Sequence, residues 1–316
     1  MGCSIPGSGT TERGWPGPPG DRRPDGPARL LRRRRAVASP LATSGLAIVL
    51  LYAVLALAAP RLAPHSPTTM YVDRILQPPG PLHPLGTDEF GRDVLSRLMY
   101  GARSTLAVAA GAVLLALGVG VPVGTVSGYF GHHLDSVLMR AMDVLLAFPA
   151  LLLALAVIAI LGQATANVVV AIGLVYIPQF ARIARASVLS LKELEFVEAG
   201  RALGLSSWRL LVRHVLPNIT SPLIVQASLS LSLAVLYESA LTFLGMGTQP
   251  PTPSWGLMLK AGRRFMQLAP WTTVAPGVAI MALVLGFNLL GDGLRDMLDP
   301  RLRGVVGGVQ RNLPGR

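Results

Sequence analysis

Apolar residues gather in long runs along this chain, and short polar stretches separate the runs. A helix needs about 20 apolar residues to cross the hydrocarbon core of a bilayer. Six runs approach that length: 41–59, 104–126, 137–160, 166–183, 219–244 and 271–290. In lipid every backbone polar group needs an internal partner, so such spans are helical. The pattern predicts an all-α polytopic membrane protein with six transmembrane helices.

Composition and charge agree with this pattern and give an orientation. The chain has 316 residues and is 51% hydrophobic and 14% charged, whereas soluble domains carry about 25% charged residues. If the N-terminus lies inside the cell, the inner segments hold 20 of the 28 Lys and Arg residues. Since positive charge collects on cytoplasmic loops, we expect both termini in the cytoplasm. This bias explains the net charge of +12 without a nucleic-acid partner.

The spans divide the chain into four sections. Residues 1–38 are rich in Pro, Gly and Arg, so we expect a disordered, basic cytoplasmic tail. Residues 39–103 hold the first transmembrane helix and an extracytoplasmic segment. Residues 104–303 form the helical core, with a cytoplasmic loop at 188–217. Residues 304–316 form a second cytoplasmic tail.

Motifs of catalytic and metal-binding proteins are missing from the sequence. Both lysines follow leucine, so there is no phosphate-binding Gly-Lys-Ser/Thr loop, and neither HExxH nor GxSxG occurs. The one cysteine, Cys3, allows no disulfide framework and no cysteine metal site. The adjacent His132 and His133 cannot share a helix face. We therefore expect no catalytic residue, no metal site and no cofactor.

The run at 219–244 is unusually polar for a membrane span. Gln226, Ser230 and Tyr237 fall roughly on one helical face by their spacing. An ionisable residue inside a span, here Glu238, usually faces a bundle interior or a watery cavity. We predict that this helix lines a pathway across the membrane. For Glu238, a position at the outer membrane interface is the alternative.

Two motifs lie on the predicted outer side. Residues 85–97 read LGTDEFGRDVLSR, where Thr87 or Asp88 could cap a short helix and the charged residues could form ion pairs. Residues 246–256 read MGTQPPTPSWG, which predicts a Pro-rich loop with an exposed tryptophan. Both motifs could be simple loop structure, or they could close an outer mouth or receive a soluble partner. The candidate residues for that role are Asp88, Arg92, Asp93 and Trp255.

A charged stretch, EAGRALGLSSWRLLVRHVLP at 198–217, separates two of the apolar runs. A helix is expected to end near Leu203, because Gly204 suits a helix C-terminus. Ser206 or Ser207 could cap a second helix, which Pro217 would end or kink. Two helices joined by a short turn can also bind DNA, but here the second helix would have to leave the membrane surface to reach a DNA groove. The pattern therefore favours docking into a groove on a cytoplasmic partner.

At these residues the chain resembles the permease subunits of bacterial ABC importers, whose EAA loop has this spacing. The matching residues are Glu198, Ala199, Gly200, Gly204, Leu216 and Pro217. Gly200 stands where alanine is usual, and His214 where isoleucine is usual. The dipeptide/oligopeptide/nickel branch is suggested by RHVLPN, HPLGTDEFGRDVLSR, GTQPPTPSWG and FNLLGDGLRDMLDPRL. The resemblance covers about residues 40–303.

The resemblance implies a type I importer fold in a bacterial inner membrane and a transport subunit without catalytic activity. Its implied partners are a homologous permease, two ATP-binding subunits that hold the ATP and Mg, and an extracytoplasmic solute-binding protein. Glu198 would contact the ATPase, and Gly204 would allow the turn. The implied cargo is a di- or oligopeptide, with nickel or glutathione as alternatives. Two other classes considered are a membrane-anchored regulator and an intramembrane enzyme that uses Asp143 and Glu238.

Overall fold

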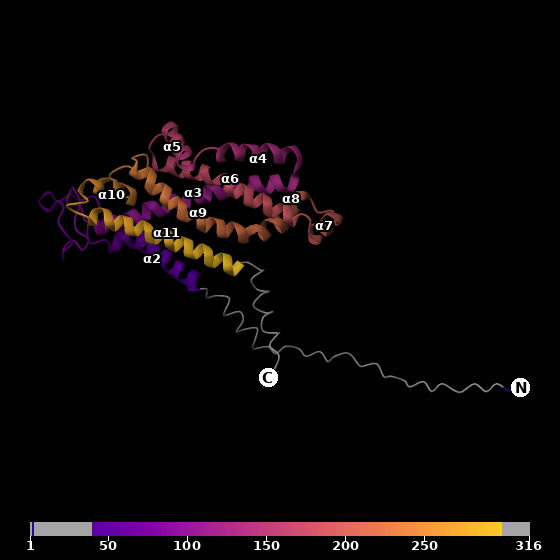
Figure 1. The fold of residues 1–316 in the computed structure, drawn as a ribbon, viewed down its shortest axis with the longest axis horizontal. Coiled ribbons are helices and arrows are strands. Elements are labelled where there is room, and N and C mark those ends of the chain that lie inside the picture. The colour runs from indigo at the N-terminus through magenta and orange to yellow at the C-terminus, as the bar shows by residue number, and fades with distance from the viewer. Residues whose placement is uncertain (1, 3–39, 299–316) are drawn as a thin grey trace. The chain divides into compact units, whose positions relative to one another are not determined.

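The computed structural model describes residue 2 and residues 40–298, and these fold into helices joined by loops (Figure 1). Apart from residue 2, the predicted tail at 1–38 lies outside the described residues, as does the tail at 304–316. Within the described part, extended pairing is limited to one bridge between Thr87 and Asp93. The expectation of an all-α chain is therefore confirmed for these residues.

The described α-helices differ widely in length. They are α2 (Pro40–Leu62), α3 (Val94–Phe130), α4 (His132–Leu146), α5 (Ala150–Leu161), α6 (Thr165–Leu191), α7 (Glu195–Ala202), α8 (Ser207–Leu210), α9 (Thr220–Phe243), α10 (Trp255–Gly262) and α11 (Trp271–Leu298). Shorter helical turns are η1 (Val72–Arg74), the π-helical η2 (Leu211–Val215), η3 (Leu216–Ile219) and η4 (Arg263–Phe265).

Five helical stretches of the described chain are long and apolar enough to cross a membrane. They are α2, α3, α6, α11 and the continuous stretch Ser207–Phe243, which contains α8, η2, η3 and α9. Each overlaps one predicted span. The prediction for 137–160 as one helix is wrong, because α4 and α5 meet there at a bend of 92°. This pair makes a sixth span only if the broken helix is counted as one.

The bend between α4 and α5 has a local cause. Pro149 stands immediately before α5. Proline has no backbone N–H to continue a helix, and it disfavours helical geometry at the preceding residue, Phe148. The two halves also differ in polarity, since α4 carries Asp135, Arg140 and Asp143 whereas α5 is wholly apolar. Only α5 therefore has the composition of a lipid-embedded segment.

The α3–α6 pair lies at the centre of the bundle, and glycines allow its close approach. Gly120, Gly124 and Gly128 recur every four residues, a spacing that predicts tight helix contact in lipid. A β-carbon at Gly120 would lie 2.6 Å from the Ile177 carbonyl oxygen, and one at Gly124 would collide with the Ala181 carbonyl. The predicted contact is confirmed.

The remaining long helices pack around this pair. α9 contacts both α3 and α6, α11 packs against α9, and α2 packs against α11 and α3. The helical turn at α7 lies at one end of the body, whereas α10 and the indigo loops of 63–93 lie at the opposite end (Figure 1). The two groups of candidate loop residues are therefore separated by the length of the bundle.

Candidate functional site

The stretch 198–217 forms a helix, a tight turn and a second helix, as its sequence predicts. α7 ends at Ala202 with Leu203 as its C-cap, and Gly204 follows with φ of +77°. The Leu205 N–H donates to the Gly200 carbonyl at 3.1 Å, and the Gly204 N–H donates to the Arg201 carbonyl at 2.9 Å. These two bonds make a Schellman motif, which satisfies carbonyls at the helix end. Gly204 fits because a left-handed φ costs a glycine no steric strain.

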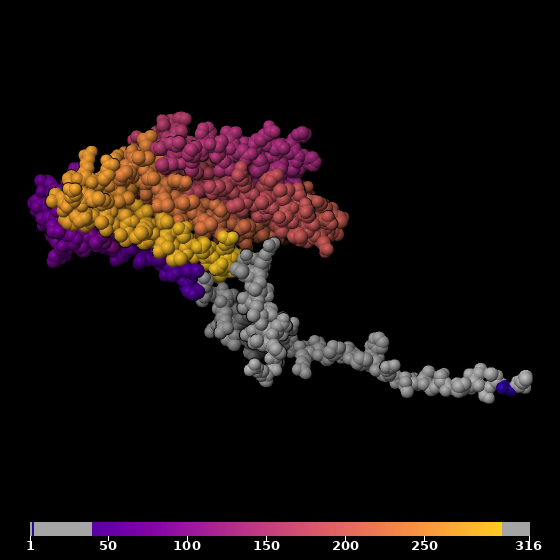
Figure 2. Space-filling model, viewed as in Figure 1, coloured from indigo at the N-terminus to yellow at the C-terminus, as the bar shows by residue number. Residues whose placement is uncertain are grey.

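The side chains of this turn face outward. Glu198, Ala199 and Gly204 are exposed, whereas Gly200 is buried. Large apolar side chains are exposed beside them, with Leu203 at 83% and Trp208 at 64%. In the space-filling view α7 and α8 form the end of the body opposite α10 (Figure 2). Clustered apolar side chains on an otherwise polar surface are typical of a protein contact surface.

Gly200, the departure from the usual alanine, has a packing explanation. A β-carbon at this position would lie 2.6 Å from Cδ2 of Leu210 and 3.4 Å from Cδ1 of Leu205. Leu210 is the last residue of α8 and is buried. The glycine therefore lets α8 fold back closely onto α7.

A surface hollow of about 500 Å³ lies next to the turn. Glu198 and Arg201 line it from α7, Lys192 lines it from the end of α6, and Asp135 lines it from α4. Arg201 also lies over the Tyr129 ring, with its guanidinium carbon 5.5 Å from the ring centroid. Charges of both signs on one concave surface suit a partner with a complementary charged face.

Polar contacts fix this end of the bundle. Arg185 of α6 donates two hydrogen bonds to Asp135, each 2.6 Å long, and Ser127 of α3 bonds to the same carboxylate. Lys192 donates to the Gly128 carbonyl at 3.2 Å. Paired charged hydrogen bonds of this geometry are among the strongest in proteins. They hold the base from which α7 projects.

The second helix does not stop at Pro217, and its Ser206 cap makes no side-chain hydrogen bond. α8 continues through η2 and η3 directly into α9. Pro217 lies in η3, and Leu216 before it is partly buried. A π-turn followed by a tighter turn accommodates the proline, which lacks a backbone N–H. Of the two predicted effects of Pro217, termination is wrong.

Two of the four polar pathway candidates on α9 are linked directly. The Gln226 amide donates to Gln179 of α6 at 3.1 Å and to the Ser230 hydroxyl at 3.2 Å. Gln226 also lines a hollow of about 590 Å³ between α6, α9 and α11, together with Ser221 and Arg295. Ser230 is fully buried.

Tyr237 and Glu238 lie further along α9. The Tyr237 ring lies 6.0 Å from that of Tyr176 on α6. Glu238 has no exposed surface and accepts hydrogen bonds from Thr105 of α3 at 3.0 Å and from Thr242 at 3.1 Å. It therefore links α9 to α3 within the bundle. Asp143, its proposed partner in an intramembrane enzyme, is half exposed and pairs with Arg182.

The motif at 85–97 forms a buried ionic network, but neither Thr87 nor Asp88 caps the helix. The cap of α3 is Asp93, which accepts from the Ser96 N–H at 2.8 Å. Asp88 instead accepts from the N–H and the Nε of Arg92 at 2.9 and 2.7 Å. The sequence alone does not show which aspartate caps α3, because each is followed by residues whose backbone N–H groups could donate to it. The predicted ion pairs are present, yet Asp88, Arg92 and Asp93 are all buried.

The same network affects a neighbouring acid. Glu89 lies beside Asp88 and receives a hydrogen bond from Arg92 at 3.3 Å. Burial raises the pKa of the Glu89 carboxyl, and the nearby Asp88 carboxylate raises it further. Both effects disfavour the charged form of Glu89.

Trp255 was expected to be exposed, and that expectation is wrong. Its side chain is fully buried at the start of α10. The indole Nε1 donates to the Leu98 carbonyl at 2.9 Å, and the ring meets Tyr52 of α2 edge-on at 5.5 Å. A large aromatic ring with a satisfied N–H is stable inside a bundle. Trp255 therefore holds α10 against α3 and α2.

Sequence reasoning missed a cluster in the outer segment, where His65, His83 and Asp93 come together. The histidines lie far apart in a segment without regular helix or strand spacing, so their meeting follows only from the folded loop. Two histidines followed by an aspartate within residues 63–93 were the available signal, but their intervals match no known metal motif.

The long spans, the close-packed core and the exposed turn define a helical, multi-span membrane protein. The chain belongs to the family described as binding-protein-dependent transport system inner membrane component, which matches residues 120–304. The N-terminal TM domain of oligopeptide transport permease C matches residues 29–79. The family consists of multi-span permeases of the inner membrane, which are transport components and not enzymes.

Similar proteins include permeases with different named cargoes. The dipeptide transport system permease protein DppC of Alkalihalophilus pseudofirmus is 46% identical, with 83% of this chain and 86% of the relative covered. The di/tripeptide permease DppC of Pseudomonas aeruginosa is 45% identical (84% and 89%). The glutathione permease GsiD of Pectobacterium atrosepticum is 43% identical (87% and 90%).

A solved structure supports the fold. The inward-facing MetNI methionine ABC transporter aligns with a TM-score of 0.53 at 18% identity, over 64% of this chain and 96% of that chain. The chain therefore has the type I ABC importer permease fold that the resemblance implied. In physical terms, this is a helical core with a short exposed helix between two spans.

Proposed function

We propose that the chain is one permease subunit of an ATP-driven importer of short peptides, with both termini in the cytoplasm. The observation that carries this proposal is the exposed turn at Gly204, where Leu203 and Trp208 present apolar surface beside Glu198. The chain's own sequence has no phosphate-binding loop. ATP and Mg are accordingly assigned to two cytoplasmic partner subunits, and α7 is assigned to a cleft on one of them.

The turn transmits motion because it is rigid at both ends. The Schellman motif fixes α7 against α8, and α8 continues into α9 without a loop. Arg185 and Asp135 hold the neighbouring helices together. A displacement of α7 by its partner would therefore move α9 as a packed unit, as in a rigid-body transition between two arrangements.

The pathway is assigned to the polar side of α9. Gln226 lines the hollow near the inner end of the helix, and Arg295 of α11 lines the same hollow. Amide and guanidinium groups suit the carbonyls and the terminal carboxylate of a peptide. Ser230, Tyr237 and Glu238 continue the polar side of α9 outward, and they belong to the proposed pathway when the helices separate.

A complete importer needs further subunits. We propose a homologous permease as the second half of the pathway and an extracytoplasmic binding protein that delivers the cargo to the outer end. We assign the delivery face to the outer motif at 85–97, which is held in place by its buried ionic network, and to the segment leading to Trp255. Trp255 itself is buried in the bundle. Glutathione is itself a short peptide, so the names of the relatives agree on a peptide backbone as cargo.

The test is uptake of labelled cargo in cells that lack this chain and carry it on a plasmid. We expect restored uptake of a labelled dipeptide, and loss of it with Glu198→Lys while the protein stays in the membrane. Labelled glutathione and nickel are assayed in parallel. Uptake of either without the dipeptide would contradict the peptide assignment, and uptake that ignores Glu198→Lys would contradict the coupling role.

A further inference from the structure

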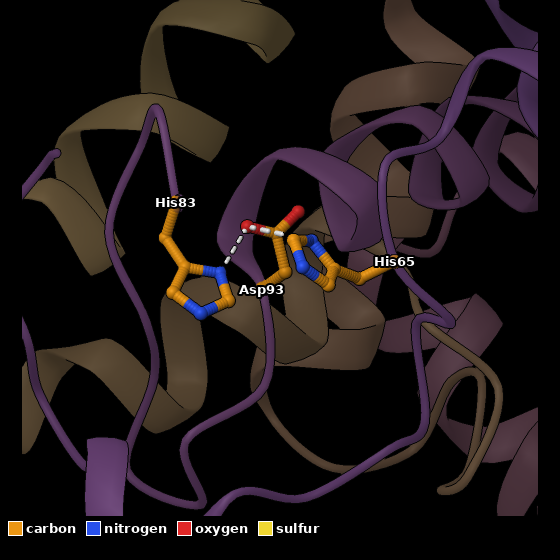
Figure 3. Close-up of side chains that lie close together, drawn as sticks. All are labelled: His65, His83 and Asp93. Atoms are coloured by element: carbon orange, nitrogen blue, oxygen red, sulfur yellow. Dashed lines mark hydrogen bonds and ion pairs between the residues drawn. The ribbon is translucent and has the colours of Figure 1, made fainter. Parts of the chain in front are cut away.

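Three metal-ligating side chains meet at the outer end of the bundle (Figure 3). His65 follows α2, His83 lies in the following loop, and Asp93 caps α3. One ligand atom from each lies within 4.8 Å of the others. None of the three belongs to the exposed turn or to the polar side of α9. The cluster is thus separate from the proposed coupling turn and pathway, although Asp93 also belongs to the outer motif at 85–97.

Asp93 presents one carboxylate oxygen to the two imidazoles. Its Oδ2 accepts from the N–H and the hydroxyl of Ser96 at 2.8 and 2.7 Å. Its Oδ1 lies 2.9 Å from Nδ1 of His83 and 3.9 Å from Nδ1 of His65. Metal-binding carboxylates are commonly fixed by such outer hydrogen bonds. The Ser96 contacts therefore hold Oδ1 ready as a ligand.

The hydrogen bond between His83 and Asp93 leaves part of the cluster unsatisfied. Nδ1 of His65 is buried and has no hydrogen-bond partner, and the same holds for Nε2 of His83. Buried polar atoms in folded proteins nearly always have a partner. A cation beside Oδ1 of Asp93 would provide a partner for Nδ1 of His65.

The dimensions fit a transition metal. Zinc binds imidazole nitrogen and carboxylate oxygen at about 2.0–2.2 Å, so tetrahedral ligand atoms lie about 3.4 Å apart. The distances of 2.9 and 3.9 Å lie on either side of that value, and shifts of under about 1 Å would equalise them. His65 is 19% exposed while His83 and Asp93 are buried. A cation would therefore enter past His65 and keep a water in the fourth position.

We propose that His65, His83 and Asp93 bind one divalent transition-metal ion, with zinc as the best match to two imidazoles and a carboxylate. The ion would join the end of α2 to the start of α3 and fix the loops between them. Binding requires the neutral imidazole of His83 to carry its proton on Nε2, so that Nδ1 is free to coordinate the ion. We assign the ion a structural role, because its ligands link the loops after α2 to Asp93 at the start of α3.

Zinc binding to the purified full-length chain in lipid nanodiscs tests this proposal. After treatment with a chelator and desalting, the protein is titrated with zinc chloride, and retained metal is counted by mass spectrometry. Cobalt(II) chloride gives a second measure through its visible absorption. We expect one ion per chain, with affinity reduced at least about tenfold by His65→Ala and by His83→Gln.

Matched variants distinguish specific metal binding at the cluster from nonspecific binding by other histidines. His132 and His133 are exposed at the start of α4, so changing both to Ala removes two imidazoles without touching the cluster. Asp93→Asn keeps a cap acceptor for α3 and should lose the metal while the chain stays folded by gel filtration. Failure of the unmodified chain to retain zinc overturns the proposal. Retention that survives His65→Ala combined with His83→Gln, or depends on His132 and His133, overturns it equally. None of these readouts depends on transport.

Discussion

Cδ2 of Leu210 occupies the space that a β-carbon on Gly200 would need, only 2.6 Å from its position. The contact is with the far end of a flexible side chain, so a single methyl group can be accommodated by a small rotation of Leu210. A branched side chain needs more room than that rotation provides. The size of the residue at 200 therefore sets how closely α8 packs on α7.

Gly200→Ala should retain most transport activity. Alanine favours the helix by about 1 kcal/mol over glycine, which offsets the shift of Leu210. Gly200→Val should reduce uptake strongly while the protein level in the membrane is unchanged. The double variant Gly200→Val with Leu210→Ala should recover part of the loss, because the space is returned. Equal uptake by the Ala and Val single variants would contradict the packing explanation.

Gly204 offers a test of backbone geometry alone. A β-carbon there meets no atom within 4 Å, but φ is +77°. Asparagine tolerates left-handed geometry and valine does not. Gly204→Asn should keep co-purification of the ATP-binding subunit near the unmodified level, and Gly204→Val should abolish it. A loss with both variants would show that the small size of the residue, and not its φ, is required.

Glu238 separates a structural role from a pathway role. Thr105 donates to Oε2 of Glu238 and Thr242 donates to Oε1. Glu238→Gln keeps one acceptor oxygen and puts an NH2 in the other place, where a threonine hydroxyl can accept instead of donating. Glu238→Ala leaves buried hydroxyls without partners, at a cost of about 1–3 kcal/mol. The melting temperature in detergent should fall with Ala and change little with Gln. Uptake measured in parallel decides the pathway role. A Gln variant with unchanged melting and reduced uptake supports it, and unchanged uptake contradicts it.

Glu89 should make the thermal stability of the chain depend on pH. Burial raises its pKa above the ordinary 4.5 in the folded chain. The folded state therefore binds the proton more tightly, and the contribution of Glu89 to stability falls as pH rises through the interval between the two pKa values. The melting temperature of the unmodified chain minus that of Glu89→Gln should decrease from pH 4.5 upward. Gln at the exposed Glu193 controls for loss of charge. A difference that is flat or increases contradicts this assignment.

The sequence predicts those features that depend on local composition. Apolar run length gives five of the described spans, because burial in lipid is a property of each segment by itself. Gly204 marks the end of α7 because positive φ selects glycine. Features that depend on distant residues were missed. Trp255 is buried because Leu98 and Tyr52 lie against it, and no pattern near residue 255 shows that contact.

The other differences have similar causes. The length of an apolar run does not show whether the helix it forms is straight. The bend at Pro149 lies within such a run and was therefore not predicted. Asp88 and Asp93 have equivalent local sequence for capping, and the ion pairs with Arg92 and Arg97 decide which one serves α3. The histidine cluster requires the folded outer loops. Long-range contacts, and not composition, determine each of these features.

The uninterrupted helical stretch from Ser207 to Phe243 has 37 residues. At 1.5 Å per residue such a stretch is about 55 Å long, and the hydrocarbon core of a membrane is only about 30 Å thick. The stretch therefore exceeds the hydrocarbon core by roughly 25 Å, which is more than the roughly 5–8 Å depth of one headgroup layer. With α9 in the hydrocarbon core, this excess length puts the turn at Gly204 beyond the headgroups, where a soluble protein can bind it without entering the membrane.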